Sequence, residues 1–223
     1  MTDATPLSPA EMTLDELRPL LVEAMLPHVP FDGWTLTAAE AAASDLGLPM
    51  GRARITFPGG AADMVAAYID FADARMLRAL GDRLHNLKIR DRITVAVRTR
   101  LEQATGEREA IRRALGILGM PQNLALSART LWKTADIIWR AAGDTATDYN
   151  HYTKRLILGG VYSSTLLVWL NDESEGFADS WAFLDRRIGD VMRFEKTKAQ
   201  FLNSGERMPS LTRFLGRLRY PAV

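Results

Sequence analysis

The sequence predicts an all-α protein whose helices pack around one core. Apolar residues recur at helical spacing (i, i+3, i+4, i+7) along most of the 223 residues, and alternation of apolar and polar residues typical of strands is hard to find. Capping and helix-stopping residues separate the periodic segments, and the connections between them are short. We therefore expect a single compact helical domain.

Ten helices are expected from this periodicity. The first begins with a capping box formed by Thr13 and Glu16, and the pair Thr37 and Glu40 repeats the pattern near the second. Glycine and proline residues mark several of the helix ends. In chain order the expected helices lie near residues 12–27, 36–46, 50–56, 61–80, 87–104, 107–119, 124–142, 148–170, 177–200 and 210–219.

The composition limits the class of protein. A hydrophobic fraction of 47% and a charged fraction of 25% are typical of soluble globular proteins. The absence of cysteine excludes disulfides, thiolate catalysis and thiolate metal ligands. No apolar run reaches the ~20 residues of a membrane-spanning helix, and no N-terminal stretch has the pattern of a signal peptide. We expect a protein of a reducing compartment that does not span a membrane.

Charge is distributed unevenly along the chain. Residues 1–70 contain three basic residues against ten acidic ones, whereas the rest contains 25 basic and 17 acidic residues. Within the acidic part, "FDGWTLTAAEAAASDLGLPMGRARITFPGGAADMVAAYID" predicts a helix, a turn at Gly47 and a short second helix carrying Arg52 and Arg54. This helix-turn-helix layout resembles the N-terminal region of TetR-type regulators.

The helix-turn-helix layout has two interpretations. Its short second helix could contact an operator, or the helices could be a packing unit without DNA contacts. Duplex binding depends on Lys and Arg residues that neutralise phosphates, yet residues 1–70 contain no lysine. Gly59 and Gly60 stand where a DNA-binding member usually carries a phosphate-contacting lysine. We therefore expect no binding to nucleic acid.

The sequence offers no catalytic constellation. The three histidines, His28, His85 and His151, are scattered, and none pairs with another at metal-ligand spacing. A di-iron tetrad, a metalloprotease motif and a phosphate-binding loop are all missing. Each histidine alone is more typical of a surface or hydrogen-bonded structural residue. We predict no catalytic residue, no metal site and no cofactor, and hence a protein that is not an enzyme.

A polar and aromatic helix start lies in "TADIIWRAAGDTATDYNHYTKRLILGGVYSSTLLVWL", where Thr147 or Asp148 can cap the helix. Aromatic and Arg side chains clustered with an acid are typical of interface hot spots. A solvated helix start with half-buried tyrosines is an equally good interpretation. Further along the same helix is a surface of small residues, Gly159, Gly160, Ser163 and Ser164. It has three interpretations: a dimer contact, space beside a cavity, or ordinary tight packing.

The sequence resembles the COQ9 family of ubiquinone-biosynthesis accessory proteins from about Leu17 to Arg193. The resemblance is carried by "AGDTATDYNHYTKR", "LVWLNDESEGFADSWAFLDRRI", "KIRDRI" and "RRALGILGMPQNL". It implies a bacterial member with a TetR-like fold that has lost DNA binding, forms homodimers and holds an isoprenoid lipid among its C-terminal helices. It further implies a protein that presents this lipid, or a prenylated quinone precursor, to the di-iron hydroxylase acting on demethoxyubiquinone.

The resemblance also implies a partner-binding patch. The matching positions are Asp148, Tyr152 and Arg155, and His151 stands where mitochondrial members carry tryptophan. For the lipid pocket the candidates are apolar residues of the central helices, each of which could equally be plain core: Met64, Ile93, Val97, Leu115, Leu118, Leu131 and Val161.

The last helix expected, within "MPSLTRFLGRLRY" at residues 208–220, is short and purely basic. Its apolar stripe comprises Leu211, Phe214, Leu215 and Leu218, and Arg213 and Arg217 lie off that stripe. A helix about 15 Å long is too short to span a bilayer but suits its interface. We expect weak, reversible membrane binding; the alternative is a last helix packed on the protein's own core.

Together these patterns predict a flexible N-terminus at residues 1–10, one TetR-like domain at 11–202, and a hinge with a membrane-binding helix at 203–223. Within the domain, residues 11–58 form the helix-turn-helix-like part, and 59–202 the lipid-binding and dimerisation part. The expected function is a non-enzymatic lipid-binding accessory protein, cytoplasmic and peripheral on the inner membrane. A ligand-responsive TetR-type regulator is the alternative, and a membrane-associated scaffold without a small ligand comes third.

Overall fold

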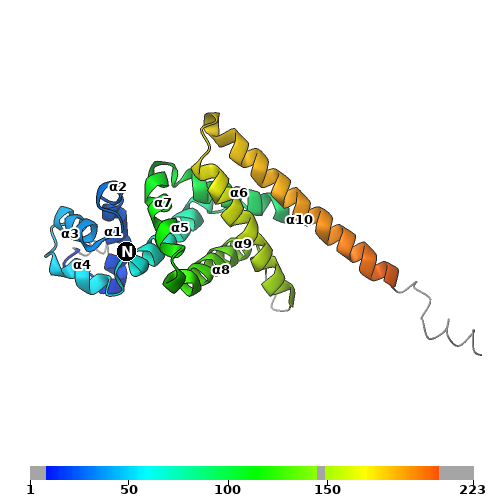
Figure 1. Cartoon of the computed structure of the whole chain (residues 1–223). Coiled ribbons are helices and arrows are strands. Elements are labelled where there is room, and N and C mark those ends of the chain that lie inside the picture. Colours follow the sequence, from blue (N-terminus) through cyan, green and yellow to red (C-terminus); the bar gives the residue numbers. More distant parts are fainter. Residues whose placement is uncertain (1–8, 145–148, 206–223) are drawn as a thin grey trace, which may run out of the picture. The chain divides into compact units, whose positions relative to one another are not determined.

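The computed structural model describes residues 9–144 and 149–205, and every regular element in them is helical (Figure 1). The all-α prediction is therefore confirmed. The α-helices are α1 (Leu14–Met25), α2 (Val29–Asp32), α3 (Leu36–Asp45), α4 (Gly51–Thr56), α5 (Gly60–Leu80), α6 (Ile89–Glu102), α7 (Arg108–Leu118), α8 (Leu124–Ala141), α9 (Tyr149–Leu170) and α10 (Ala178–Gly205). Short 3-10 turns lie at Thr105–Glu107, Pro121–Asn123 and Glu175–Phe177.

The chain divides into two compact units, Met1–Leu184 and Asp185–Val223. The first unit contains α1 to α9 and the beginning of α10, and its core and cavity are described below. In the second unit the described residues continue α10 as far as Gly205. We had expected a helix end near residue 200 and a break at Asn203, Ser204 and Gly205; instead, these three residues are helical. Residues 210–219, with the expected membrane-binding helix, lie outside the described residues.

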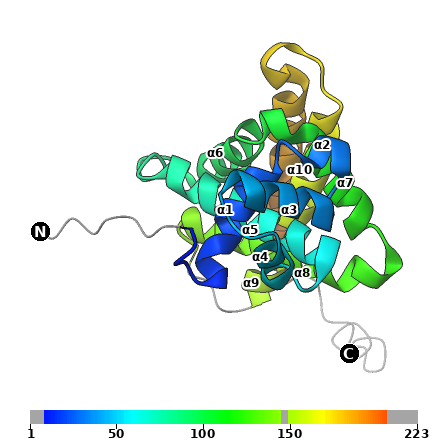
Figure 2. The same cartoon turned by 90° about the vertical axis from the view of Figure 1, so that its left-hand side faces the viewer.

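Helices α1, α3 and α4 pack together at one end of the first unit, and α1 also contacts α5 (Figure 2). Their shared core contains Leu17 and Leu21 of α1, Trp34, and alanines of α3 that let the helices approach closely. The predicted capping box is present, because the Thr13 backbone N–H donates to Glu16 Oε2 at 2.9 Å and the Thr13 hydroxyl accepts from Glu16 N–H.

The N-cap of α3 differs from the expected one. Thr35, in extended conformation, accepts a hydrogen bond from Ala38 N–H at 3.4 Å, so Thr37 lies inside the helix and makes no capping box with Glu40. The four-residue helix α2 was not expected, because a single turn leaves no apolar periodicity to detect. Pro30 in its first turn and Gly33 at its end, with φ of 72°, delimit it.

The second part of this unit is built around α5. Helix α5 contacts α6, α7 and α8, and α8 packs along α9. Buried apolar residues of these helices form a second core, which includes Met76, Val97, Ile138 and Trp169. Two buried carboxylate–guanidinium clusters interrupt this core, one at Arg100 and one at Arg155. Within the described residues, none of the helices is long and apolar enough to cross a membrane.

Candidate functional site

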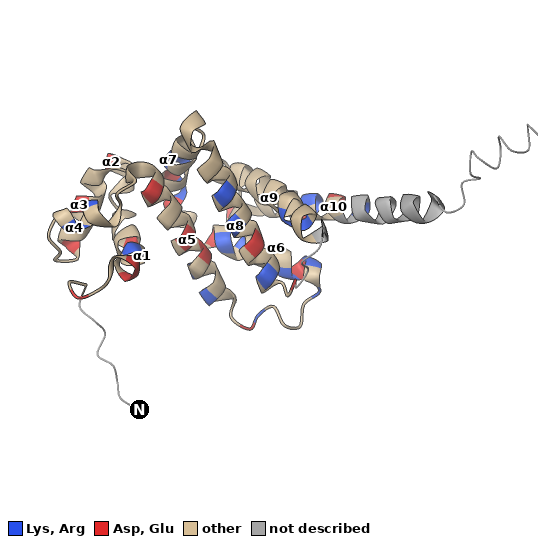
Figure 3. Cartoon of the chain, turned by 90° about the horizontal axis from the view of Figure 1, so that it is seen from below, with Lys and Arg blue, Asp and Glu red and all other residues tan. Residues whose placement is uncertain are grey.

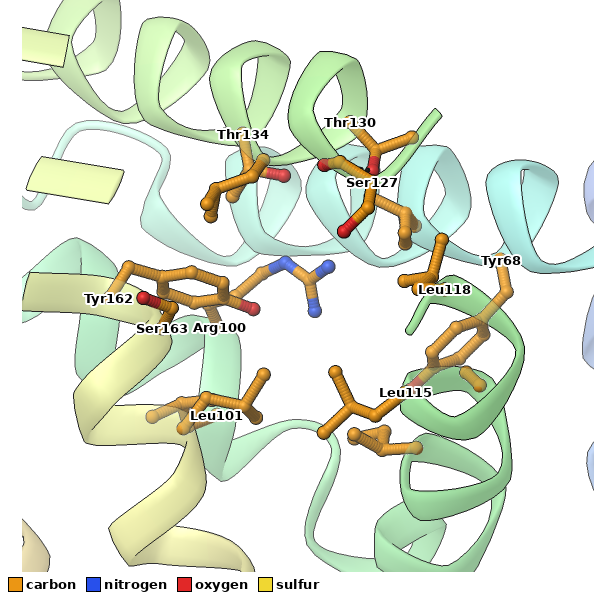
Figure 4. A pocket seen from close by; sticks show the side chains of 15 residues that line it. Tyr68, Arg100, Leu101, Leu115, Leu118, Ser127, Thr130, Thr134, Tyr162 and Ser163 are labelled. Carbon is orange, nitrogen blue, oxygen red and sulfur yellow. Dashed lines mark hydrogen bonds between the residues drawn. The ribbon is translucent and has the colours of Figure 1, made fainter. Parts of the chain in front are cut away.

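A cavity of about 140 Å³ lies among helices α5 to α9 (Figure 4). Each of the five helices contributes side chains to it, so its walls come from segments far apart in the sequence. The apolar wall consists mainly of Leu101, Ile111, Leu115, Leu118, Leu131 and Leu166. The polar side chains that line it are Tyr68, Arg100, Ser127, Thr130, Thr134, Tyr162 and Ser163. An apolar pocket with a few convergent polar groups is the usual form of a small-molecule site.

Arg100 of α6 and Asp73 of α5 form a buried ion pair beside the cavity. Arg100 Nε donates to Asp73 Oδ1 at 2.7 Å, and the side chains are 4% and 1% exposed. The Thr134 hydroxyl of α8 donates to Asp73 Oδ2 at 2.8 Å, which links three helices. Burial raises the pKa of Asp73 above its ordinary value, although Arg100 and Thr134 act in the opposite direction.

Tyr68 takes part in a second polar cluster at the same cavity. Its hydroxyl donates to Glu107 Oε2 at 2.7 Å, and the guanidinium of Arg75 holds both oxygens of that carboxylate. Burial, followed by the neighbouring Glu107 charge, raises the pKa of Tyr68 well above its ordinary value. Burial also raises the pKa of Tyr162. Both phenols therefore keep their protons at neutral pH and can donate hydrogen bonds.

The cavity contains only some of the residues predicted for a lipid pocket. Leu115, Leu118 and Leu131 line it. The other four are buried but do not line it, which favours the core interpretation for them: Met64, Ile93, Val97 and Val161. Sequence reasoning missed Arg100, although Ile93, Ala96, Val97 and Arg100 stand at i, i+3, i+4 and i+7 of α6. The charge of Arg100 at the fourth position of this otherwise apolar stripe was the signal that could have indicated a buried arginine.

The predicted partner patch is an aromatic cluster at the start of α9. Tyr152 is 62% exposed and His151 is half-buried. Trp132 of α8, which the sequence did not point to, joins them: its ring centroid lies 5.9 Å from that of Tyr152 and 6.4 Å from that of His151. Asp148 lies outside the described residues. The described patch therefore consists of Trp132, His151 and Tyr152, and we call it the aromatic patch.

Arg155 does not belong to this exposed patch, contrary to the sequence-based expectation. Its side chain is 1% exposed and donates to Asp136 at 2.6 Å and to Asp144 at 3.0 Å. A third bond goes to the carbonyl oxygen of His151 at 3.0 Å. Lys154 also binds Asp144, at 2.7 Å. The guanidinium lies beneath the aromatic patch and ties the start of α9 to the end of α8.

The small-residue surface of α9 has two sides. Gly159 is buried and faces Leu131 of α8; a Cβ there would lie 3.5 Å from Leu131 Cγ, an ordinary van der Waals contact. Gly160 is exposed and has open space around it. With Gly160, the exposed Leu156 and Leu167 form an apolar stripe along α9, the two leucines being 71% and 56% exposed.

Known proteins similar in sequence identify the family. The COQ9 family model matches residues 124–195, which include the aromatic patch and much of the cavity wall. The mitochondrial ubiquinone biosynthesis protein COQ9 of Rattus norvegicus is 34% identical over 200 residues, covering 86% of this chain and 64% of that protein. COQ9-B of Xenopus laevis is 30% identical over 205 residues, covering 86% and 68%.

The chain belongs to the COQ9 family. It spans slightly less than two thirds of the rat and human COQ9 proteins, 64% and 63% of their lengths. Among solved structures, a TetR transcriptional regulator from Nitrosomonas europaea matches with a TM-score of 0.62 and 20% identity, covering 78% of this chain and 97% of that one. The predicted TetR-like fold is thereby confirmed for this COQ9 family member.

Basic side chains are sparse on the helix-turn-helix of this COQ9 family member, formed by α3 and α4 (Figure 3). Gly47, with φ of 69°, makes the turn between the two helices. Arg52 of α4 donates to the Met12 carbonyl at 2.7 Å, so it is engaged within the protein. Arg54 is exposed and lies 3.9 Å from Glu40. Among the residues described here, no group of three His, Asp or Glu side chains is arranged to hold a metal ion.

Proposed function

We propose that this COQ9 protein is a non-enzymatic accessory protein of ubiquinone biosynthesis. It binds an isoprenoid quinone precursor at the membrane and presents it to a hydroxylase of the pathway. Family membership carries the proposal, because the relatives are named ubiquinone biosynthesis proteins. The apolar cavity among α5 to α9 supports it by providing a site for part of such a ligand.

The lipid ligand can be tested directly. The purified protein is extracted with organic solvent, and the extract is analysed by mass spectrometry beside an unrelated helical protein purified from the same cells. We expect an isoprenoid or a prenylated quinone precursor in roughly stoichiometric amount only in the first extract. An extract that contains no isoprenoid after purification without detergent contradicts the proposal.

The aromatic patch is the surface we propose for the hydroxylase. Tyr152 is exposed and Trp132 is half-buried, and Tyr and Trp side chains supply large contact areas at low cost in conformational entropy. Here the ring of Tyr152 contacts both Trp132 and His151, with centroids 5.9 and 5.2 Å away, so the three rings form one continuous surface. Pull-down of the hydroxylase by wild-type protein, compared with a Trp132→Ala variant, tests this surface.

Self-association through α9 is the oligomeric state we propose. The stripe of Leu156, Gly160 and Leu167 is exposed in the single chain, and two such stripes related by a two-fold axis bury one another. Light scattering at micromolar concentration should give a dimer for the wild type and a monomer for Leu156→Lys. A monomeric wild type contradicts this part of the proposal.

Membrane attachment is proposed for residues 210–219 from the apolar stripe and arginines in the sequence. Flotation with anionic liposomes compares the full chain with a chain ending at Gly205. We expect only the full chain to float, and its flotation to weaken with salt. Equal flotation of both chains places membrane contact elsewhere.

A ligand-responsive transcriptional regulator is the alternative function. The retained α3–α4 pair and the TetR-like fold favour it. A sequence-specific gel shift on an upstream promoter fragment at about 0.15 M salt, where non-specific phosphate contacts are weakened, would support the regulator and contradict the accessory role. The acidic residues 1–70 lead us to expect no shift.

A further inference from the structure

The guanidinium of Arg100 has unused donors that face the cavity. Among the described residues its hydrogen bonds are confined to Nε, which donates to Asp73, and neither Nη1 nor Nη2 has a partner. The Arg100 side chain is only 4% exposed, so these two nitrogens are shielded from bulk solvent. In Figure 4 its two terminal nitrogens point into the cavity, between the helices that carry Tyr162 and Ser127. A buried donor without an acceptor is costly, so such groups are usually satisfied by a ligand or by water.

The other polar side chains of the cavity divide into those that already have a hydrogen-bond partner and those that do not. Thr130 donates to carbonyls of its own helix, Thr134 donates to Asp73, and Tyr68 donates to Glu107. By contrast, the Tyr162 hydroxyl has no hydrogen-bond partner within the described part of the chain. It lies on the same side of the cavity as Arg100 (Figure 4). Because Arg is only a donor and a protonated Tyr can donate, the cavity is prepared for an acceptor oxygen.

The charges favour a neutral acceptor. Asp73 already balances the single charge of Arg100, and Arg75 balances Glu107 behind Tyr68. A carboxylate or phosphate bound to the Arg100 Nη atoms would add a second negative charge beside an Arg100–Asp73 pair whose charges already cancel. A quinone carbonyl or a methoxy oxygen accepts the same hydrogen bonds without adding charge.

The size of the cavity decides which end of an isoprenoid quinone enters. Its volume of about 140 Å³ is close to the ~150 Å³ that admits a benzene molecule in a buried apolar site. The volume therefore matches a six-membered ring, whereas a long polyprenyl chain does not fit. We propose that the cavity binds the ring end of the ligand, with Arg100 and Tyr162 donating hydrogen bonds to one neutral ring oxygen and the tail leaving along the leucine wall. This inference rests on the function proposed above.

Two isoprenoids separate ring recognition from tail binding. A ubiquinone with two isoprene units carries the oxygenated ring, and squalene is an isoprenoid without one. Both are offered to the full chain in neutral phosphatidylcholine liposomes, and the bound fraction is measured by equilibrium partitioning. Wild type should bind the short-chain quinone at least tenfold more tightly than squalene, since two or more hydrogen bonds of roughly threefold to tenfold each are gained.

Tyr162→Phe is the decisive variant, because it removes only the unused hydroxyl. We expect quinone affinity to fall roughly threefold to tenfold, while squalene affinity stays unchanged. Tyr152→Phe is the matched control: it removes the hydroxyl of an exposed tyrosine that does not line the cavity, so both affinities should stay within twofold. Arg100→Leu combined with Asp73→Leu removes the whole buried pair and should abolish the preference for the quinone; should this double variant fail to fold, Arg100→Lys replaces it.

Each other outcome overturns the inference. Equal affinity of wild type for both isoprenoids, or unchanged quinone binding by Tyr162→Phe, shows that the cavity does not recognise the ring, while the lipid-binding function stands. Tighter binding of oleate than of the quinone, lost on replacing Arg100, shows an anion site instead. If neither isoprenoid binds, the proposed function fails together with this inference.

Discussion

Arg155 of α9 and Arg100 of α6 are both buried arginines paired with aspartate, but they differ in the number of acceptors that they bind. Arg155 donates to two carboxylates and a carbonyl oxygen. Arg100 donates to one carboxylate, and its two terminal nitrogens face a cavity. A buried guanidinium shared among several acceptors joins the elements that supply them, whereas one whose terminal nitrogens face a cavity is equipped to bind a ligand.

The aspartates of the two clusters also differ, because their pKa values are shifted in opposite directions. Burial acts to raise the pKa of Asp144, but hydrogen bonds from Lys154 and Arg155 outweigh it and the pKa is lowered. For Asp73, burial outweighs Arg100 and the pKa is raised. Hydrogen bonds and neighbouring cations therefore outweigh burial at Asp144, whereas burial outweighs them at Asp73.

The largest effect is expected from Arg155→Leu. It leaves Asp136 and Asp144 without their shared cation, and breaking a buried ion pair costs about 3–5 kcal/mol. For a chain of this size the Tm should fall by roughly 10 °C or more. Thermal unfolding followed by circular dichroism measures the change. Arg140→Ala is the control, because Arg140 is 71% exposed and binds the same Asp136, and it should cost less than ~1 kcal/mol. Equal effects of the two variants would show that Arg155 is not the structural link.

A somewhat smaller loss is expected from Arg100→Leu, about 3 kcal/mol. Asp73 keeps its hydrogen bond from Thr134 and can take up a proton, because burial already raises its pKa. Replacing both members of the pair by leucine should recover at least half of the loss, since an apolar pair removes the unbalanced charge. Urea unfolding of the single and double variants measures both values. A double variant less stable than Arg100→Leu would show that Asp73 is stabilising by itself.

The pH dependence of stability should have opposite signs in the two clusters. Because the folded-state pKa of Asp144 is lowered, its stabilisation is complete above the ordinary Asp pKa of ~3.9 and is lost as pH falls further. The raised pKa of Asp73 means that its contribution is complete below ~3.9 and is lost as pH rises through the folded-state pKa. The deficit of Asp144→Asn relative to wild type should therefore shrink as the pH falls from 7 to 3.

The deficit of Asp73→Asn should instead grow over the same pH range. Unfolding free energies at four or five pH values measure both difference curves, and wild type in the same buffers is the reference. Curves of equal slope for the two variants would show that the two carboxylates have similar surroundings, and would remove the electrostatic distinction between the clusters.

The sequence predicted the fold better than it predicted the site. Long amphipathic helices were located within a few residues because periodicity reports burial along one element. The capping box at Thr13 was found, whereas the cap at Thr35 was assigned to Thr37, since both threonines precede the same alanine run. Sequence pattern does not report which helices meet, so the contact of Trp132 with Tyr152 was missed.

The functional residues illustrate the same limit. Arg155 was assigned to the partner-binding patch because it matches the COQ9 family's pattern, yet its burial depends on Asp136 and Asp144, which precede α9 in the chain. Leu115, Leu118 and Leu131 were placed at the cavity, but the other four candidates were indistinguishable from them by residue type. Which buried leucine faces a void is decided by the packing of several helices.

The smallest effect on stability is expected from Tyr152→Ala, although Tyr152 and Arg155 lie in one turn of α9. Tyr152 is 62% exposed, so its removal should cost no more than ~1 kcal/mol, mostly from the lost contact with Trp132. Ubiquinone output in cells should nevertheless fall if the aromatic patch binds the hydroxylase, and Tyr152→Phe, which keeps the ring, should restore most of it. Quinone extraction and chromatography measure the output at matched protein levels. Normal output from a stable Tyr152→Ala protein would contradict the proposed role of the aromatic patch in partner binding.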